Sequence, residues 1–405
     1  MRIQRNQSRL SFRHKRRRTS GCLPLAILLG LLVGIAGMSW NWIGQWFTAA
    51  VSRQSGDDLM AAARQAFDEG DLDKAVELSQ QALAIDPDSA DAVVLLARAL
   101  VYRSYSDYNR GVDRESALQV TAEALSRVPT NPDVLAAHAF TLQAAGQQAE
   151  AAEVARRALD LVPDHGLART ALALAYGGVG SFEISLRENL QAVQSSNWRL
   201  DSQRALAISY SDLGDYDSAM GAVDRAIALN SRLIPLYFER ALYALQTGDT
   251  DAATGAYFQV LVYDPANVKA RLRLCEVSSL LRERDAAIRY CTEVTARAPN
   301  WADGWYQLGR EYFLQGNFRA AQDALHRCSV LQVMQDVPVP QRRFECWYLQ
   351  GQAAEILGDC ENLLATYNEF RAMALDPSVQ QTWVYPPEGP PRCSAPQTTL
   401  SPTSP

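Results

Sequence analysis

The sequence predicts an all-α protein in which a solenoid of stacked helix hairpins is preceded by one transmembrane helix. The solenoid follows from a pattern of small residues that returns every 34 residues through most of the chain, with prolines at the same spacing between repeats. The transmembrane helix follows from residues 23–43, which are nearly all apolar, and from the lack of any charge between Arg18 and Arg53.

The apolar segment Leu23–Ile43 is 21 residues long, about what a helix needs to cross ~30 Å of hydrocarbon. Tryptophans cluster at residues 40–46, where their amphipathic rings favour the lipid–water boundary. Residues 1–22 carry eight basic side chains and no acid. We therefore expect a single-pass cell-membrane protein with a basic cytoplasmic head, and with everything after about residue 48 outside the cytoplasm.

A cleaved signal peptide is the alternative to this anchor, because Gly34-Ile35-Ala36 would serve as a small-x-small cleavage site. The apolar run continues past that site into the tryptophan cluster, which favours retention. Gly30 and Gly34 form a G-x-x-x-G pair that could pack two anchors into a homodimer, although small residues are common in spanning helices anyway.

The repeat is clearest in the small residue that we expect in the second helix of each hairpin. It recurs in one register at Ala75, Ala117, Ala151, Ser185, Ala219, Ala253, Ala287 and Ala321. Two antiparallel helices joined by a short turn approach closely only where side chains are small, and each hairpin leaves an apolar face that only its neighbour can cover. Eight small residues in register over about 270 residues therefore predict a stacked solenoid.

One stretch carries a family resemblance. Trp305, Leu308, Gly309 and Tyr312 reproduce the spacing W-x2-L-G-x2-Y, with Ala321 following in register, and this resembles the tetratricopeptide repeat. The resemblance implies a right-handed superhelix of about nine repeats over residues 56–375, similar to bacterial membrane-tethered proteins of this family. Residues 376–405 are rich in Pro, Ser and Thr and predict a disordered tail.

Two steps of the repeat are 42 residues long instead of 34. The first extra segment, around Tyr102, Tyr105 and Tyr108, is expected to lengthen its helix by two turns and to add a loop through Gly111. The second runs through Val337–Pro340. Such insertions sit on the rim of a solenoid and could touch a partner, or the extra tyrosines could pack locally.

Charge and motifs argue against several function classes. The net charge of −6 hides an acidic body, with 31 Lys and Arg against 45 Asp and Glu after residue 22, so nucleic acid is not an expected partner. We find no catalytic, cofactor or metal motif, and we expect a protein that is not an enzyme. Turns such as Gly70-Asp71 could suggest calcium, but further ligands are missing and helix capping explains them.

Six cysteines lie beyond the anchor, and an even number outside the cytoplasm permits three disulfides. Cys275 and Cys291 fall at matching heights in the two helices of one repeat, and Cys328 and Cys346 are similarly placed across the next junction. That leaves Cys360 and Cys393, which would pin the tail. The alternative is that a cysteine at a small-residue position is only a small core residue.

The resemblance also implies that first helices line a concave groove for a protein or peptide partner. The groove positions expected here are Phe140, Leu174, Ile208, Phe238, Leu242, Leu245, Tyr306, Arg310, Phe313 and Tyr348. If exposed, they form an apolar trough. If the superhelix is tightly wound, they are partly buried against neighbouring repeats. The Asn–Lys set of the family's carboxylate-gripping members is missing.

These observations predict a membrane-anchored adaptor or scaffold that gathers proteins outside the cytoplasm, in envelope assembly or secretion. The alternative is a substrate-capturing or regulatory subunit of an enzyme complex, with catalysis on a separate chain.

Overall fold

The computed structural model describes residues 55–194 and 198–379, and within these ranges the chain is helical and contains no strand. No helix in these ranges combines the length and the apolarity that a membrane crossing needs. The predicted anchor Leu23–Ile43 lies outside the described residues, as do Cys393 and most of the predicted tail.

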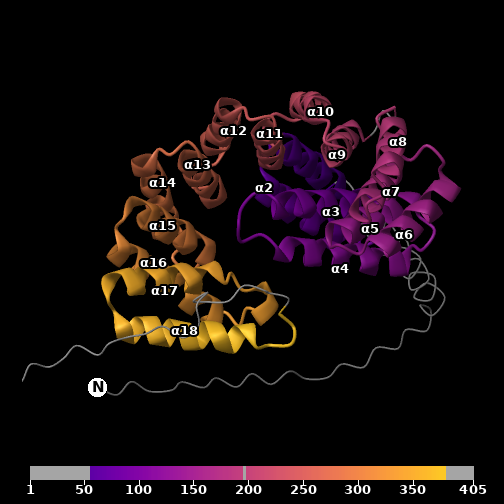
Figure 1. Cartoon of the computed structure of the whole chain (residues 1–405). Coiled ribbons are helices and arrows are strands. Elements are labelled where there is room, and N and C mark those ends of the chain that lie inside the picture. Colours follow the sequence, from indigo (N-terminus) through magenta and orange to yellow (C-terminus); the bar gives the residue numbers. More distant parts are fainter. Residues whose placement is uncertain (1–54, 195–197, 380–405) are drawn as a thin grey trace, which may run out of the picture. The chain divides into compact units, whose positions relative to one another are not determined.

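Successive helices contact one another along the chain, as expected for stacked hairpins (Figure 1). After a helix over residues 55–68, they are α2 (Leu72–Ile85), α3 (Ala90–Ser104), α4 (Val112–Arg127), α5 (Pro132–Ala144), α6 (Gln148–Leu161), α7 (Gly166–Gly178), α8 (Phe182–Ala192), α9 (Arg199–Asp212), α10 (Tyr216–Leu229), α11 (Ile234–Gln246), α12 (Thr250–Tyr263), α13 (Val268–Leu280), α14 (Arg284–Arg297), α15 (Ala302–Gln315), α16 (Phe318–Met334), the 3-10 helix η1 (Val339–Gln341), α17 (Glu345–Leu357) and α18 (Cys360–Ala374). Taken in pairs, these helices form repeats one to nine. The predicted all-α solenoid is confirmed.

The turns inside the hairpins show why each second helix begins where it does. Asp71, Asp215 and Asp249 accept hydrogen bonds from the backbone N–H three residues later, at 3.1, 3.1 and 2.8 Å. These bonds satisfy amides that the first turn of a helix leaves unpaired. The residue before each of them is a glycine in the left-handed conformation, such as Gly248 at φ 83°.

The small residues lie where the two helices of a hairpin approach. All eight in the second-helix series are at most 1% exposed. At Gly309 in α15, a Cβ atom would lie 2.6 Å from the side chain of Leu325 in α16, so only glycine permits this approach. The register predicted from the sequence therefore reflects helix packing.

The first insertion differs from its expected form. Helix α3 has 15 residues against 13 in α5, so it gains two residues and not two turns. Most of the remaining length forms the connection 105–111 and extends α4 to 16 residues. The second insertion lengthens α16 to 17 residues and then forms η1.

The connection 105–111 packs against repeats that are far away in the sequence. Tyr108 stacks on Trp301, with ring centroids 4.4 Å apart. Asn267 donates a hydrogen bond to the carbonyl of Ser106 at 2.9 Å, across 161 positions of sequence. The backbone N–H of Lys269 donates to Asp107 at 3.0 Å. The insertion therefore joins repeat two to repeat seven.

A second group of long-range contacts lies beside these. Arg98 in α3 pairs with Asp201 in α9 at 2.7 Å, and Asn230 donates to the carbonyl of Phe67 at 2.9 Å. We call all these contacts between repeats one and two and repeats five to seven the seam. Through the seam, repeats one and two pack against repeats five to seven. The extra tyrosines of the first insertion take part in these long-range contacts and do not form an exposed rim.

Candidate functional site

The expected groove residues differ in how far they are exposed. Phe140 in α5 is 1% exposed and belongs to the same apolar cluster as Tyr102. Phe140 is therefore buried, which corresponds to the alternative in which the superhelix is tightly wound. Leu174 and Ile208, which follow Phe140 in steps of 34 residues, are half-buried. The middle of the predicted trough does not form an open surface.

An open groove does form at repeats six to eight. Its cavity of about 790 Å³ is lined by Phe238, Leu242 and Leu245 from α11 and by Tyr257 from α12. Leu242 is 48% exposed. Arg310 from α15 also lines the cavity. We call this cavity the groove.

The other expected positions lie outside the groove. Tyr306 lines a neighbouring cavity of about 370 Å³, where the guanidinium of Arg343 lies 4.5 Å from its ring centroid. Phe313 packs edge-on against Phe318, with centroids 5.3 Å apart. Tyr348 packs partly buried against the apolar cluster of the last repeats. Four of the ten expected residues therefore meet in the groove.

The groove also carries a concentration of charge that the sequence interpretation missed. Its cationic lining residues are Arg204, Lys269, Arg273, Arg282, Arg284 and Arg310. Two carboxylates, Glu239 and Glu276, share the lining, and Glu311 lies buried beneath it. The spacing of Lys269 and Arg273, one helical turn apart on α13, was the available signal.

Ion pairs hold part of this charge in place. Arg204 and Glu239 form a largely buried pair at 2.6 Å. The fully buried Glu311 accepts from Arg284 at 2.7 Å and lies 3.2 Å from Arg310, and Ser279 donates to it at 2.5 Å. The six cationic side chains of the lining outnumber the three carboxylates in and beneath it, so the groove keeps a net positive charge.

Lys269 lies at the junction of the groove and the seam. Its Nζ donates to the carbonyl of Tyr105 at 2.7 Å and lies 4.3 Å from the ring centroid of Phe238. Burial, and then the nearby charge of Arg273, lower the pKa of Lys269 to about 8, because both disfavour a further positive charge. Among the described residues, no carboxylate lies within ion-pair distance of its ammonium group.

Comparisons with known proteins identify the repeat. Residues 66–101 and residues 204–271 each match a family model described as tetratricopeptide repeat. The chain carries tetratricopeptide repeats. No relative among the curated proteins matches the sequence.

Two solved structures agree with the tetratricopeptide-repeat fold. A crystal structure of the APC/C hetero-tetramer Cut9-Hcn1 superposes with a TM-score of 0.53 at 18% identity, covering 75% of this chain and 57% of that one, which is less than two thirds of its length. A human IFIT1 dimer with m7Gppp-AAAA gives 0.50 at 15% identity, with 78% and 81% covered. At such identities the likeness shows the fold alone.

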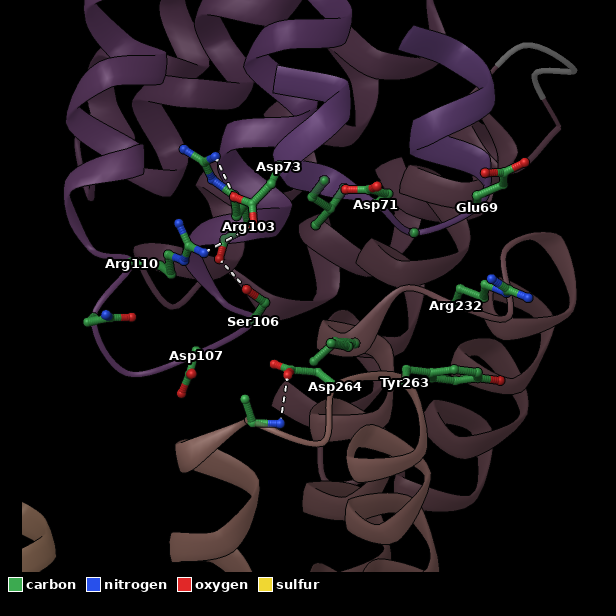
Figure 2. A pocket seen from close by; sticks show the side chains of 15 residues that line it. Glu69, Asp71, Asp73, Arg103, Ser106, Asp107, Arg110, Arg232, Tyr263 and Asp264 are labelled. Atoms are coloured by element: carbon green, nitrogen blue, oxygen red, sulfur yellow. Dashed lines mark hydrogen bonds and ion pairs between the residues drawn. The ribbon is translucent and has the colours of Figure 1, made fainter. Parts of the chain in front are cut away.

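A second, polar cleft of about 560 Å³ lies at the edge of the seam, between repeats one and two and repeat six with its flanking connections (Figure 2). Asp73 pairs there with Arg103 at 2.8 Å and with Arg110 at 3.2 Å. Gly70 closes one wall, where a Cβ atom would lie 2.6 Å from Arg232. The described residues contain no group of three or more His, Cys, Asp or Glu that could hold a metal ion. Three of the charged residues at this edge, Asp73, Arg103 and Arg110, pair with one another.

Within residues 55–194 and 198–379, two of the expected cysteine pairs are joined. Cys275 and Cys291 are joined by a disulfide between α13 and α14, with Cα atoms 5.5 Å apart. Cys328 and Cys346 are joined between α16 and α17, with Cα atoms 5.9 Å apart. Cys360 begins α18, and its expected partner lies outside the described residues. Both described disulfides lie in the tetratricopeptide repeats around and after the groove.

Proposed function

We propose that this chain is a membrane-anchored scaffold whose tetratricopeptide repeats hold a segment of a partner protein in the groove. The observation that carries the proposal is the exposure of Leu242 beside Phe238 and Leu245 in the groove. A helix face that exposes neighbouring apolar side chains in a concave surface is typical of peptide recognition.

The anchor is the second part of the proposal. It is supported by the apolar segment Leu23–Ile43 behind a head with eight basic residues, which favours a cytoplasmic N-terminus. The solenoid then lies outside the cytoplasm, a location that suits the disulfides Cys275–Cys291 and Cys328–Cys346.

A binding role, and not catalysis, also suits the histidines of the described residues. His138 is buried and lies 3.0 Å from the hydroxyl of Thr121. His165 accepts from the N–H of Ala168 and so caps α7, while its other nitrogen lies 3.1 Å from Asp133. His326 lies 3.3 Å from the amide of Gln350. Each has a structural partner between helices of the repeats.

The test of the groove is site-specific photo-crosslinking in the native cell, with a photoreactive phenylalanine analogue at position 242. The matched control carries the analogue at Val262, which is 68% exposed on α12 and does not line the groove. We expect a discrete crosslinked partner from position 242 that Leu242→Asp removes and Val262→Asp leaves. An unchanged partner set in a folded Leu242→Asp variant contradicts the proposal.

The test of the anchor compares the full chain with a chain that begins at residue 48. We expect only the full chain to remain with membranes after an alkaline carbonate wash. A protease added to the extracytoplasmic side should digest its solenoid. Release of the full chain by the wash, or protection of the solenoid, contradicts an anchored extracytoplasmic scaffold.

A further inference from the structure

We infer that the groove selects an acidic segment of its partner, an extended peptide that places carboxylates beside an apolar anchor residue. This inference rests on the proposed function and names the class of partner for the same groove. Three observations carry it: the sign of the groove's charge, the donors that its cations leave unused, and the backbone conformation of Arg282.

The groove has the opposite charge to the body of the protein. Six cationic side chains face three carboxylates there, whereas after residue 22 the chain as a whole has 31 basic against 45 acidic residues. A cationic cavity in an acidic surface attracts an anionic segment to one place and repels it elsewhere. Complementary charge of this kind raises association rates and rejects wrong partners more than it adds raw affinity.

The ion pairs of the groove leave donors for a ligand. Arg284 and Arg310 each contact Glu311 through one terminal nitrogen, and a guanidinium has five N–H donors. Arg310 and Arg273 remain 41% and 46% exposed. No ion pair among the described residues includes Arg282. A carboxylate can therefore bind without first breaking an internal pair.

Arg282 is held in a conformation that its side chain disfavours. Its φ is 63°, at the turn position where seven other hairpins have glycine with φ between 69° and 85°. A non-glycine residue in the left-handed region is strained, because its Cβ atom lies too close to the following carbonyl oxygen. Because this residue is an arginine and not a glycine, it adds a positive charge to the lining of the groove. Strain of this kind is typical of functional positions.

The apolar wall favours a peptide over a nucleic acid. Phe238, Leu242 and Leu245 line the groove together with the cations, and the Lys269 ammonium lies 4.3 Å from the Phe238 ring centroid, so an occupant needs an apolar group as well as negative charge. A phosphate backbone also carries its charge over a long stretch, which the acidic remainder of the protein repels.

The test is fluorescence anisotropy with the full chain in detergent micelles and labelled nine-residue peptides that alternate leucine with glutamate, glutamine or lysine. We expect the glutamate peptide to bind at least ten-fold more tightly than the glutamine peptide at ~0.1 M salt, with an affinity that falls as salt rises. The double variant Arg282→Gln, Arg310→Gln should remove this preference. The control Arg187→Gln, at an exposed site on α8, should keep it.

The other outcomes separate the two proposals. If glutamate and glutamine peptides bind equally and Leu242→Asp weakens both, the groove binds peptides but the acidic selectivity is refuted. If Leu242→Asp changes the affinity of none of the peptides, the groove proposal itself fails. If a capped tetranucleotide RNA binds more tightly than the glutamate peptide and displaces it, the groove selects nucleic acid and the inference is overturned.

Discussion

The guanidinium of Arg98 in α3 lies 2.7 Å from the carboxylate of Asp201 in α9, 103 positions later in the chain. The hydroxyl of Tyr102 donates to the same carboxylate at 3.2 Å. The Arg98 guanidinium also lies over the rings of Phe67 and Trp198, at 4.7 and 5.2 Å from their centroids. A charged pair enclosed by aromatic rings thus fastens repeat two to repeat five, and the seam depends on it.

Replacement of Asp201 by asparagine should destabilise the solenoid strongly. The asparagine keeps the size of the side chain but leaves the Arg98 charge buried without a counterion, so we expect the free energy of unfolding to fall by about 3–5 kcal/mol. The control Asp91→Asn removes the exposed pair with Arg64, at 2.7 Å, and should cost less than ~1 kcal/mol. Urea unfolding followed by circular dichroism measures both. Equal effects would contradict a buried pair.

Replacement of Tyr108 by alanine should open the seam without unfolding the hairpins. It removes the stack on Trp301, while the helices themselves keep their own hydrogen bonds. We expect faster amide hydrogen exchange in residues 102–111 and at the start of α13, a larger radius of gyration in solution scattering, and an unchanged helix signal. Tyr176→Ala is the matched control, because Tyr176 contacts Arg156 in the adjacent repeat at 3.0 Å. An unchanged exchange pattern in Tyr108→Ala contradicts the seam.

The sequence predicts the hairpins well because their packing is local. The small residues predicted in register from Ala75 to Ala321 all lie in the second helices of the hairpins and are at most 1% exposed. The small residues that mark the register contact helices only a few tens of positions away. A periodic sequence therefore contains most of the information about each repeat and its neighbour.

The accessible surface was harder to predict, because it depends on contacts between distant repeats. Phe140 and Leu242 occupy equivalent positions in their repeats, yet Phe140 is 1% exposed and Leu242 is 48% exposed. The contacts between distant repeats are formed by single residues such as Asn267 and Ser106, which carry no periodic signal. The sequence interpretation also missed the groove's cations, because they lie on separate helices such as α13 and α15 that the folded chain brings together with α11.

The disulfide between Cys275 and Cys291 should stabilise repeat seven. Its cysteines are 16 positions apart, and closing a loop of that length contributes about 3 kcal/mol by restricting the unfolded chain. We expect non-reduced digests of the protein to contain the linked peptides. The double variant Cys275→Ala, Cys291→Ala should unfold at a lower urea concentration, and reductant should have less effect on it than on the wild type. Free thiols at both positions would contradict the bond.

Replacement of Arg282 by glycine should stabilise the protein, although it removes a charge from the groove. Glycine adopts the observed φ of 63° without strain, so the expected gain is about 1 kcal/mol in the free energy of unfolding. The reciprocal control is Gly248→Arg, at φ 83° with open space around its Cβ position, which should lose a similar amount. Thermal unfolding measures both. A destabilised Arg282→Gly variant would show that the arginine makes contacts that outweigh the strain.

The lowered pKa of Lys269 makes its contribution to stability dependent on pH. In the folded chain its pKa falls from 10.5 to about 8, so between pH 8 and pH 10 the folded protein loses a proton that the unfolded chain still binds. Stability rises with pH wherever the unfolded state binds more protons. The free energy of unfolding of the wild type, relative to Lys269→Met, should therefore increase across this window.

Methionine is the appropriate replacement, because it keeps an unbranched apolar stem beside Phe238 and has no proton to lose. Other groups that ionise in the same range, including the tyrosines, are present in both proteins and cancel in the difference. Urea unfolding at pH 7.5 and pH 10 gives the two values. If the difference between wild type and Lys269→Met is the same at both pH values, Lys269 keeps its ordinary pKa and is not enclosed at the junction of the groove and the seam.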